Sequence, residues 1–173
     1  MTFIPSYTQI DSPDPVNPQD LATKNYVDVK PFIQLTSPTA PTSVAGATTQ
    51  MTGWTATFQR GVGSWGSPTA NAFNIGLAGL YRVKLSIYWG LSTAFNTDQA
   101  FHALIYRNGA VAARGSLYVV TLTTGAGSCC SVDKTLNCAL NDTITFYAQA
   151  GVASSSINTL PEGTYAEVAY LQP

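Results

Sequence analysis

The chain has 173 residues, enough for one domain with its own hydrophobic core and a short appended segment. Only 10% of its residues are charged, where soluble domains carry roughly 25%, so we expect other protein to cover much of its surface. The eight basic residues are scattered, which argues against nucleic-acid binding. The sequence contains no uninterrupted run of about 18 apolar residues, so it predicts no membrane-spanning helix.

The first 16 residues predict an extended arm. Pro5, Pro13 and Pro15 alternate there with Ser, Thr and Asp, a composition that disfavours packed elements. The start, MTFIPSYTQIDSPDP, lacks the basic beginning and the continuous apolar run of a signal peptide. Residues 1–30 hold four Asp against two Lys, so the arm carries a net charge of −2.

The next stretch, NPQDLATKNYVD (residues 17–28), predicts a short helix of about two turns. Asn17 suits the N-cap, Pro18 the first helical position, and Asp20 the positive end of the helix dipole. Ala22, Tyr26 and Val29 fall on one side. Because isolated helices below about 12 to 15 residues are marginal in water, this helix must dock on another surface.

From Pro31 onward the sequence predicts β-structure. LYRVKLSIYWG (residues 80–90) alternates apolar and polar residues, which is typical of a half-buried strand. Asn108 and Gly109 lie between two apolar runs and predict a tight hairpin, because both turn positions need positive φ. Further strands are expected at residues 54–60, 116–124, 128–138, 142–150 and 163–171.

Seven or eight strands at this spacing predict an all-β fold, an antiparallel sandwich or jelly roll. Residues 101–107 and 142–150 place apolar groups on both strand faces. An outward apolar face calls for a partner, and a homotrimer or similar ring would supply it. The residues expected in the trimer interface or the core are Tyr81, Leu85, Trp89, Tyr106, Phe146, Tyr147 and Tyr170.

No motif predicts catalysis, a cofactor or a metal site. GVGSWG (residues 61–66) has the letters of a dinucleotide-binding turn, but Ser, Pro and Thr follow it and no helix opens. The single histidine, His102, lies in an expected strand, and the sequence has no G-x-S-x-G nucleophile elbow, which argues against a serine hydrolase. A glycosidase would need two facing carboxylates, but the few acids of the β domain lie mostly at expected turns. We therefore expect a protein that is not an enzyme.

The three cysteines, Cys129, Cys130 and Cys138, cannot all pair within one chain and include no C-x-x-C unit. They are interpreted as small strand residues in a reducing compartment, with a Cys–His nucleophile pair as a minor alternative. Among Trp54, Trp65 and Trp89, strand positions favour core or interface, and Trp65 in its glycine-rich loop is the candidate glycan contact.

Asn17 to Asp28 resembles the LATKxYVD segment of tail fibres, minor tail proteins and other virion surface proteins of tailed bacteriophages. In those proteins the segment commonly lies near the junction between an anchoring part and a distal β domain. The resemblance implies docking on capsid or tail proteins. The expected docking residues are Asn17, Pro18, Asp20, Leu21, Lys24, Tyr26 and Val27.

Residues 36–171 are similar to the jelly rolls of tumour necrosis factor and the complement globular head. The segments that carry this resemblance are AFNIGLAGLYRVKLSIYWG, ALIYRNGAV, LNCALNDTITFYA and TYAEVAYL. It implies a tight trimer formed through aromatic-rich faces. The acidic calcium ligands of the family cannot be located, and no collagen-like or coiled-coil stalk is present.

Taken together, the sequence predicts a virion-anchoring arm (residues 1–30) and a jelly-roll head (residues 31–173) of a structural phage protein. Made in the host cytoplasm, it would sit on the virion surface as a capsid decoration protein or head fibre. The alternative is a tail fibre or minor tail protein that binds a host surface glycan or protein.

Overall fold

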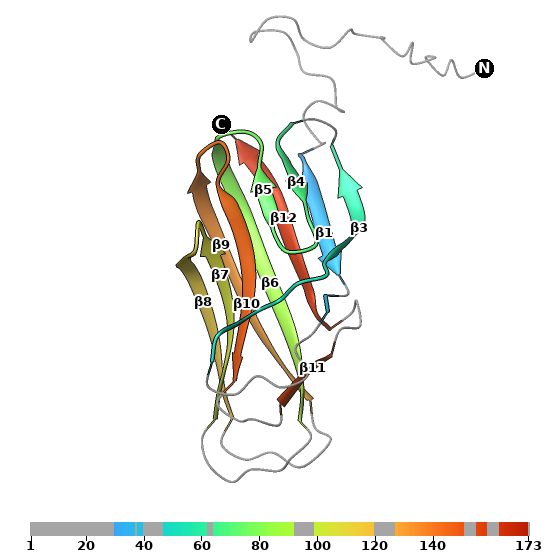
Figure 1. Cartoon of the computed structure of the whole chain (residues 1–173), viewed down its shortest axis with the longest axis vertical. Helices are drawn as coiled ribbons and strands as arrows, with labels where there is room; N and C mark the ends of the chain where they lie inside the picture. Colours follow the sequence, from blue (N-terminus) through green and yellow to red (C-terminus); the bar gives the residue numbers. More distant parts are fainter. Residues whose placement is uncertain are drawn as a thin grey trace, which may run out of the picture.

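The computed structural model describes residues 30–36, 38–39, 47–61, 64–91, 99–119, 127–150, 155–158 and 163–172. The predicted helix and the docking residues within 17–27 lie outside these ranges. Within them, twelve strands form two antiparallel sheets, which face each other as two layers (Figure 1). In this described part, no helix is both long and apolar enough to span a bilayer.

The first layer, here the β6 sheet, is organised around the longest strand. β6 pairs with β9 along one edge and with β11 and β12 along the other; β1 follows β12, and β3 forms the outer edge. Its members are β1 (Phe32–Thr36), β3 (Thr55–Arg60), β6 (Gly79–Leu91), β9 (Gly127–Cys138), β11 (Ser155–Asn158) and β12 (Tyr165–Gln172).

The second layer, here the β10 sheet, has the order β4, β5, β10, β7, β8. β7 pairs with one edge of β10, and the short strands β2 and β5 both pair with its other edge. Its members are β2 (Thr49–Gln50), β4 (Gly66–Pro68), β5 (Phe73–Ile75), β7 (Gln99–Arg107), β8 (Ala110–Val119) and β10 (Thr143–Ala150).

The core lies between the two sheets and results from the period-two pattern of the strands. Every second residue of β10, from Ile144 to Ala150, is buried, and so is every second residue of β6 from Tyr81 to Trp89. Burying one large apolar side chain contributes roughly 1.5–3 kcal/mol, so these two strands supply much of the stability. Of the residues predicted for interface or core, Tyr81, Leu85, Trp89 and Phe146 are completely buried core residues.

The predicted hairpin between β7 and β8 is confirmed. Asn108 and Gly109 have φ values of 51° and 78°, the left-handed conformation that such a two-residue turn requires. One bulge between Ile105 and Tyr106 shifts the register of the hairpin. Therefore His102 pairs with Ser116, one residue further than an unbroken ladder would place it.

The sandwich closes where β8 of one sheet meets β9 of the other. A Cβ at Gly115 would lie only 2.0 Å from the carbonyl oxygen of Ser131. Only a residue without a side chain allows the two backbones to approach this closely. The closure thus depends on Gly115.

The structure has more strands than the seven or eight predicted. The additional ones are β1, β2, β4, β5 and β11, each of five residues or fewer, which is too short for alternation to stand out. The strand predicted at 116–124 corresponds to the end of β8, and residues 120–124 lie outside the described part.

Candidate interaction surface

A row of charged side chains crosses the outer face of the β6 sheet. In the strand register Glu167 lies opposite Lys84, and Lys84 opposite Asp133. The Lys84 Nζ to Glu167 Oε2 distance is 3.9 Å, and Arg82 Nε donates to both carboxylate oxygens of Asp133 at 3.0 Å. Exposed ion pairs stabilise a fold little, so the row matters more for what this face can bind.

Hydrogen bonds favour the charged forms of Arg82, Lys84 and Asp133. The bond between Arg82 and Asp133 raises the pKa of the guanidinium and lowers the pKa of the carboxyl. Lys84 Nζ donates to the Tyr165 hydroxyl at 2.8 Å, and this bond is the main cause of the raised pKa of Lys84. Arg82, Lys84 and Asp133 therefore stay charged across the neutral pH range.

Exposed aromatic surface lies beside the charges. Phe58 on the edge strand β3 is 53% exposed, and its ring centre lies 6.0 Å from that of Phe32. All six residues of β3 are exposed. A notch of about 90 Å³, lined by Phe32, Arg82, Lys84, Glu167 and Ala169, separates the aromatic from the charged part. We call Phe32, Phe58, Arg82, Lys84, Asp133 and Glu167 the β6-sheet face.

The outer face of the β10 sheet, by contrast, covers its own apolar groups. Leu104 alternates with core residues and so points outward, yet it is 0% exposed. Tyr106 and Tyr147 lie beside each other with ring centres 4.1 Å apart, and the Tyr147 hydroxyl is 3.4 Å from Gln50 Oε1. The outward apolar groups predicted for β7 and β10 thus exist, but intramolecular packing already covers a large part of them.

A serine and the histidine meet on the same sheet, which the sequence did not reveal. The distance from His102 Nδ1 to Ser116 Oγ is 2.8 Å, within reach for a nucleophile and its base. Burial, and secondarily the charge of Arg114, lowers the pKa of His102. The charge of Arg114 lies near the imidazole where the triad of a serine hydrolase has a carboxylate.

Trp65 is not the exposed loop residue that the sequence predicted. It is 3% exposed, and its ring packs 5.1 Å from Phe73 and 6.3 Å from Tyr81, measured between ring centres. An indole in this position cannot stack on a sugar without leaving the core. The half-buried Tyr170 also packs against the Tyr81 ring, with the two ring centres 5.1 Å apart.

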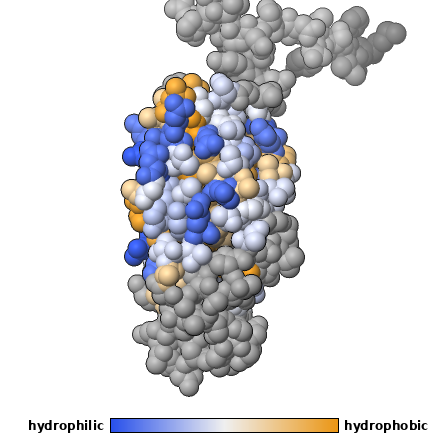
Figure 2. All heavy atoms as spheres, viewed as in Figure 1, coloured by the Kyte–Doolittle hydropathy of each residue, from blue (hydrophilic) through white to orange (hydrophobic). Residues whose placement is uncertain are grey.

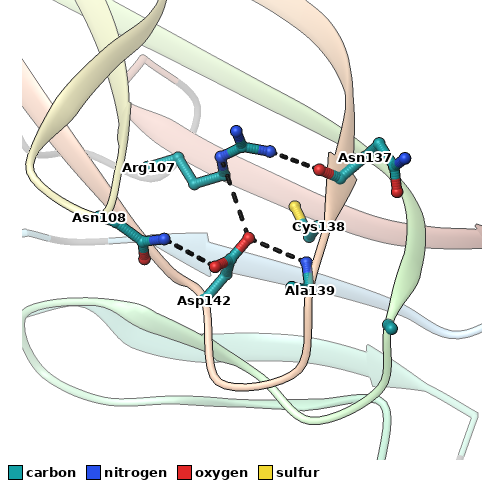
Figure 3. A pocket seen from close by; sticks show the side chains of 7 residues that line it. Arg107, Asn108, Asn137, Cys138, Ala139 and Asp142 are labelled. Atoms are coloured by element: carbon teal, nitrogen blue, oxygen red, sulfur yellow. Dashed lines mark hydrogen bonds and ion pairs between the residues drawn. The ribbon is translucent and has the colours of Figure 1, made fainter.

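An open pocket of about 440 Å³ lies at one end of the sandwich (Figure 3). Asp142 lies at its centre: Asn108 Nδ2 donates to Oδ1 at 2.6 Å and the Ala139 amide donates to Oδ2 at 2.9 Å. Arg107 lies 3.9 Å from the same carboxylate and donates to the Asn137 carbonyl (Figure 3). The polar groups that line the pocket are bonded to one another, so we interpret the pocket as a structural junction between turns.

Burial is the largest single influence on the pKa of Asp142 and acts to raise it. The hydrogen bonds from Asn108 and Ala139, with the charge of Arg107, outweigh burial, and the net pKa is lowered. The carboxyl therefore stays ionised and serves as an acceptor for these donors.

The cysteines are free in the described structure. Cys129 is exposed, whereas Cys130 and Cys138 are buried strand residues whose thiol pKa burial raises. Across the described ranges, no three His, Cys, Asp or Glu side chains gather as metal ligands.

Comparison with known proteins identifies the fold. No protein-family model and no curated protein sequence matches the chain. Among solved structures, murine APRIL at pH 8.0 matches with a TM-score of 0.60 and 14% identity over 82% of this chain and 98% of APRIL. Eiger TNF from S. frugiperda matches with a TM-score of 0.55 and 9% identity over 83% of this chain and 94% of Eiger. At such identities the likeness shows the fold alone: this chain is a TNF-like jelly-roll sandwich.

Proposed function

We propose that the chain is a non-enzymatic structural protein of a bacteriophage virion, with a homotrimeric head held on the particle by residues 1–30. Trimerisation rests on one observation above all, the exposure of Phe58 beside the notch of the β6-sheet face. TNF-like jelly rolls are typically trimeric binding domains, which supports the proposed trimer. The virion role rests on the resemblance of Asn17 to Asp28 to the phage LATKxYVD segment.

The β6-sheet face is the better candidate interface for two reasons. It combines exposed aromatic surface with fixed charges of both signs, so a partner copy can be matched in shape and in charge. A ring of three requires a head-to-tail contact between two different patches of the same chain. The aromatic side and the notch with its charges provide two such patches on one face.

The proposed trimer is tested by the mass of the head in solution. Light scattering after size-exclusion chromatography should give three times the chain mass for the native protein and one chain mass for Phe58→Asp. Gln59→Asp is the matched control, because Gln59 is also exposed on β3 but pairs opposite the inward-facing Ile33. A native protein that is monomeric at all concentrations contradicts the trimer, and a trimeric Phe58→Asp variant excludes this face.

The location on the particle is tested by immunogold electron microscopy of purified virions with an antibody against residues 31–173. Gold on the capsid is the expected result and supports a decoration protein or head fibre. Intact virions without gold contradict the virion role.

A tail fibre or minor tail protein is the second candidate. The observation that favours it is the resemblance itself, because the LATKxYVD segment recurs in tail proteins. Gold at the tail would support this candidate. Binding of the purified head to host cell-wall glycans would then be the next measurement.

A further inference from the structure

Two neighbouring turns place four exposed apolar residues at one end of the sandwich. Leu77 and Ala78 lie between β5 and β6, and Ala139 and Leu140 lie between β9 and β10. Leu77 is 43% and Leu140 58% exposed. Figure 2 shows apolar surface at the upper end of the molecule, where the β9–β10 turn lies in Figure 1. We call these four residues the apolar tip.

The apolar tip is rigid. The Asn141 amide donates to the Ile75 carbonyl at 2.9 Å and the Ile75 amide to the Asp142 carbonyl at 2.8 Å, which ties the two turns together. Asp142 is tied in turn to the β7–β8 hairpin through Asn108. A surface whose backbone is fixed before binding loses little entropy when a partner docks.

The N-terminal arm joins the head at the same end. The Tyr170 amide donates to the Pro31 carbonyl at 3.0 Å, the end of β12 pairs with the start of β6, and the start of β6 with the end of β9. Three interstrand spacings separate β1 from β9, about 15 Å in all. A helix over residues 18–28 would be about 16 Å long at 1.5 Å per residue, so it matches this span.

We propose that residues 17–29 of this chain dock on the apolar tip as a short helix, with Leu21 and Tyr26 covering Leu77 and Leu140. The sequence predicts a helix too short to be stable alone, and the apolar tip is a fixed apolar surface within its reach. Two residues, Lys30 and Pro31, connect the docked segment to the head. This contact holds the arm against the head. A particle that binds Leu21 and Tyr26 has to displace the arm from the apolar tip.

Trypsin cleavage after Lys24 in the full-length protein tests this contact. Lys24 and Lys30 are the only basic residues of the arm, and trypsin cuts poorly at Lys30 because Pro31 follows. Mass spectrometry of the released fragment 1–24 then gives the rate at one site. We expect Leu77→Asp with Leu140→Asp to raise this rate about tenfold, because proteolysis follows the population of the opened segment.

Thr55→Asp is the control, since Thr55 is exposed on β3 far from the apolar tip in the register, and it should leave the rate unchanged. Leu21→Ser with Tyr26→Ser should speed cleavage as much as the tip variant, and the four substitutions together should add nothing further. Equal rates in the native protein and the tip variant overturn the proposal. So does a native rate as fast as that of the Leu21→Ser, Tyr26→Ser variant.

Discussion

Asp142 connects residues that lie far apart in the sequence. Its partner Asn108 is 34 positions away, and the two side chains join the β7–β8 hairpin to the β9–β10 turn. Asp142→Asn replaces one acceptor oxygen by a donor that must face either Asn108 Nδ2 or the Ala139 amide. We expect a loss of about 1–2 kcal/mol in the free energy of unfolding at pH 7, measured by urea denaturation.

The same residue predicts a pH dependence. Because the pKa of Asp142 is lower in the folded state, its contribution is fully present above the unfolded value of about 4 and is lost as the pH falls through the folded value. The stability difference between the native protein and Asp142→Asn should therefore shrink below pH 4. Ser67→Ala serves as the control, since Ser67 is exposed on β4, away from the β6-sheet face, and carries no ionisable group, so its small effect should not vary with pH. A difference that persists undiminished in acid contradicts this account.

The cysteines should differ sharply in reactivity. Cys129 is exposed, whereas burial covers Cys130 and Cys138 and raises their pKa, so few of their thiols ionise near neutral pH. Iodoacetamide at pH 8 should label Cys129 alone in the folded protein and all three in urea, as read by mass spectrometry. Rapid labelling of Cys130 in the folded protein would show that β9 opens locally.

At the scale of elements, Gly115 controls the closure between β8 and β9. Gly115→Ala places a methyl group against the Ser131 carbonyl, so one strand must move, and we expect a loss of about 2 kcal/mol or more. Gly109→Ala is a useful contrast, because a Cβ there meets no atom within 4 Å and only the positive φ of 78° is strained. That strain costs about 1 kcal/mol. Thermal unfolding of both variants gives the comparison, and equal losses would mean that the close approach is not limiting.

The sequence predicted those elements whose pattern is local. Alternation over residues 80–90 predicted β6, and Asn108-Gly109 predicted the hairpin. Short strands such as β2 and β11 carry too few residues for a pattern and form only because long strands offer them an edge. The contact between His102 and Ser116 also escaped prediction, because a bulge sets it and no local signal marks that bulge.

For the β6-sheet face, too, the sequence predicted only what a local pattern can show. Alternation predicted that Arg82 and Lys84 point away from the core, but not which residues face them across the strands. Glu167 and Asp133 lie far away in the sequence, and only the register of β12 and β9 brings them together. The prediction for Trp65 was wrong for a related reason: the glycines beside it indicate an exposed loop, whereas Phe73 and Tyr81 enclose its ring.

For the whole molecule, the fold places the proposed contacts on different surfaces. The β6-sheet face lies on the side of a sheet, while the apolar tip and the start of the head at Pro31 lie at one end. A trimer formed through the sides would therefore leave three arms free to act at the same end. Three linked arms bind a particle far more tightly than one arm if all reach their sites together.

On the proposed function, replacing Leu21 and Tyr26 by Ala should release the head from virions without unfolding it. Because the substitutions change all three arms of a trimer, apparent affinity should fall by about 100-fold or more, measured by co-sedimentation with particles that lack the protein. Gln19→Ala with Asn25→Ala alters equally many arm residues without removing apolar groups and should still bind. Leu77→Asp with Leu140→Asp should bind at least as well as the native protein, because it frees the arm from the apolar tip. Continued binding by the Leu21→Ala, Tyr26→Ala variant would show that surfaces other than these two side chains hold the head on the particle.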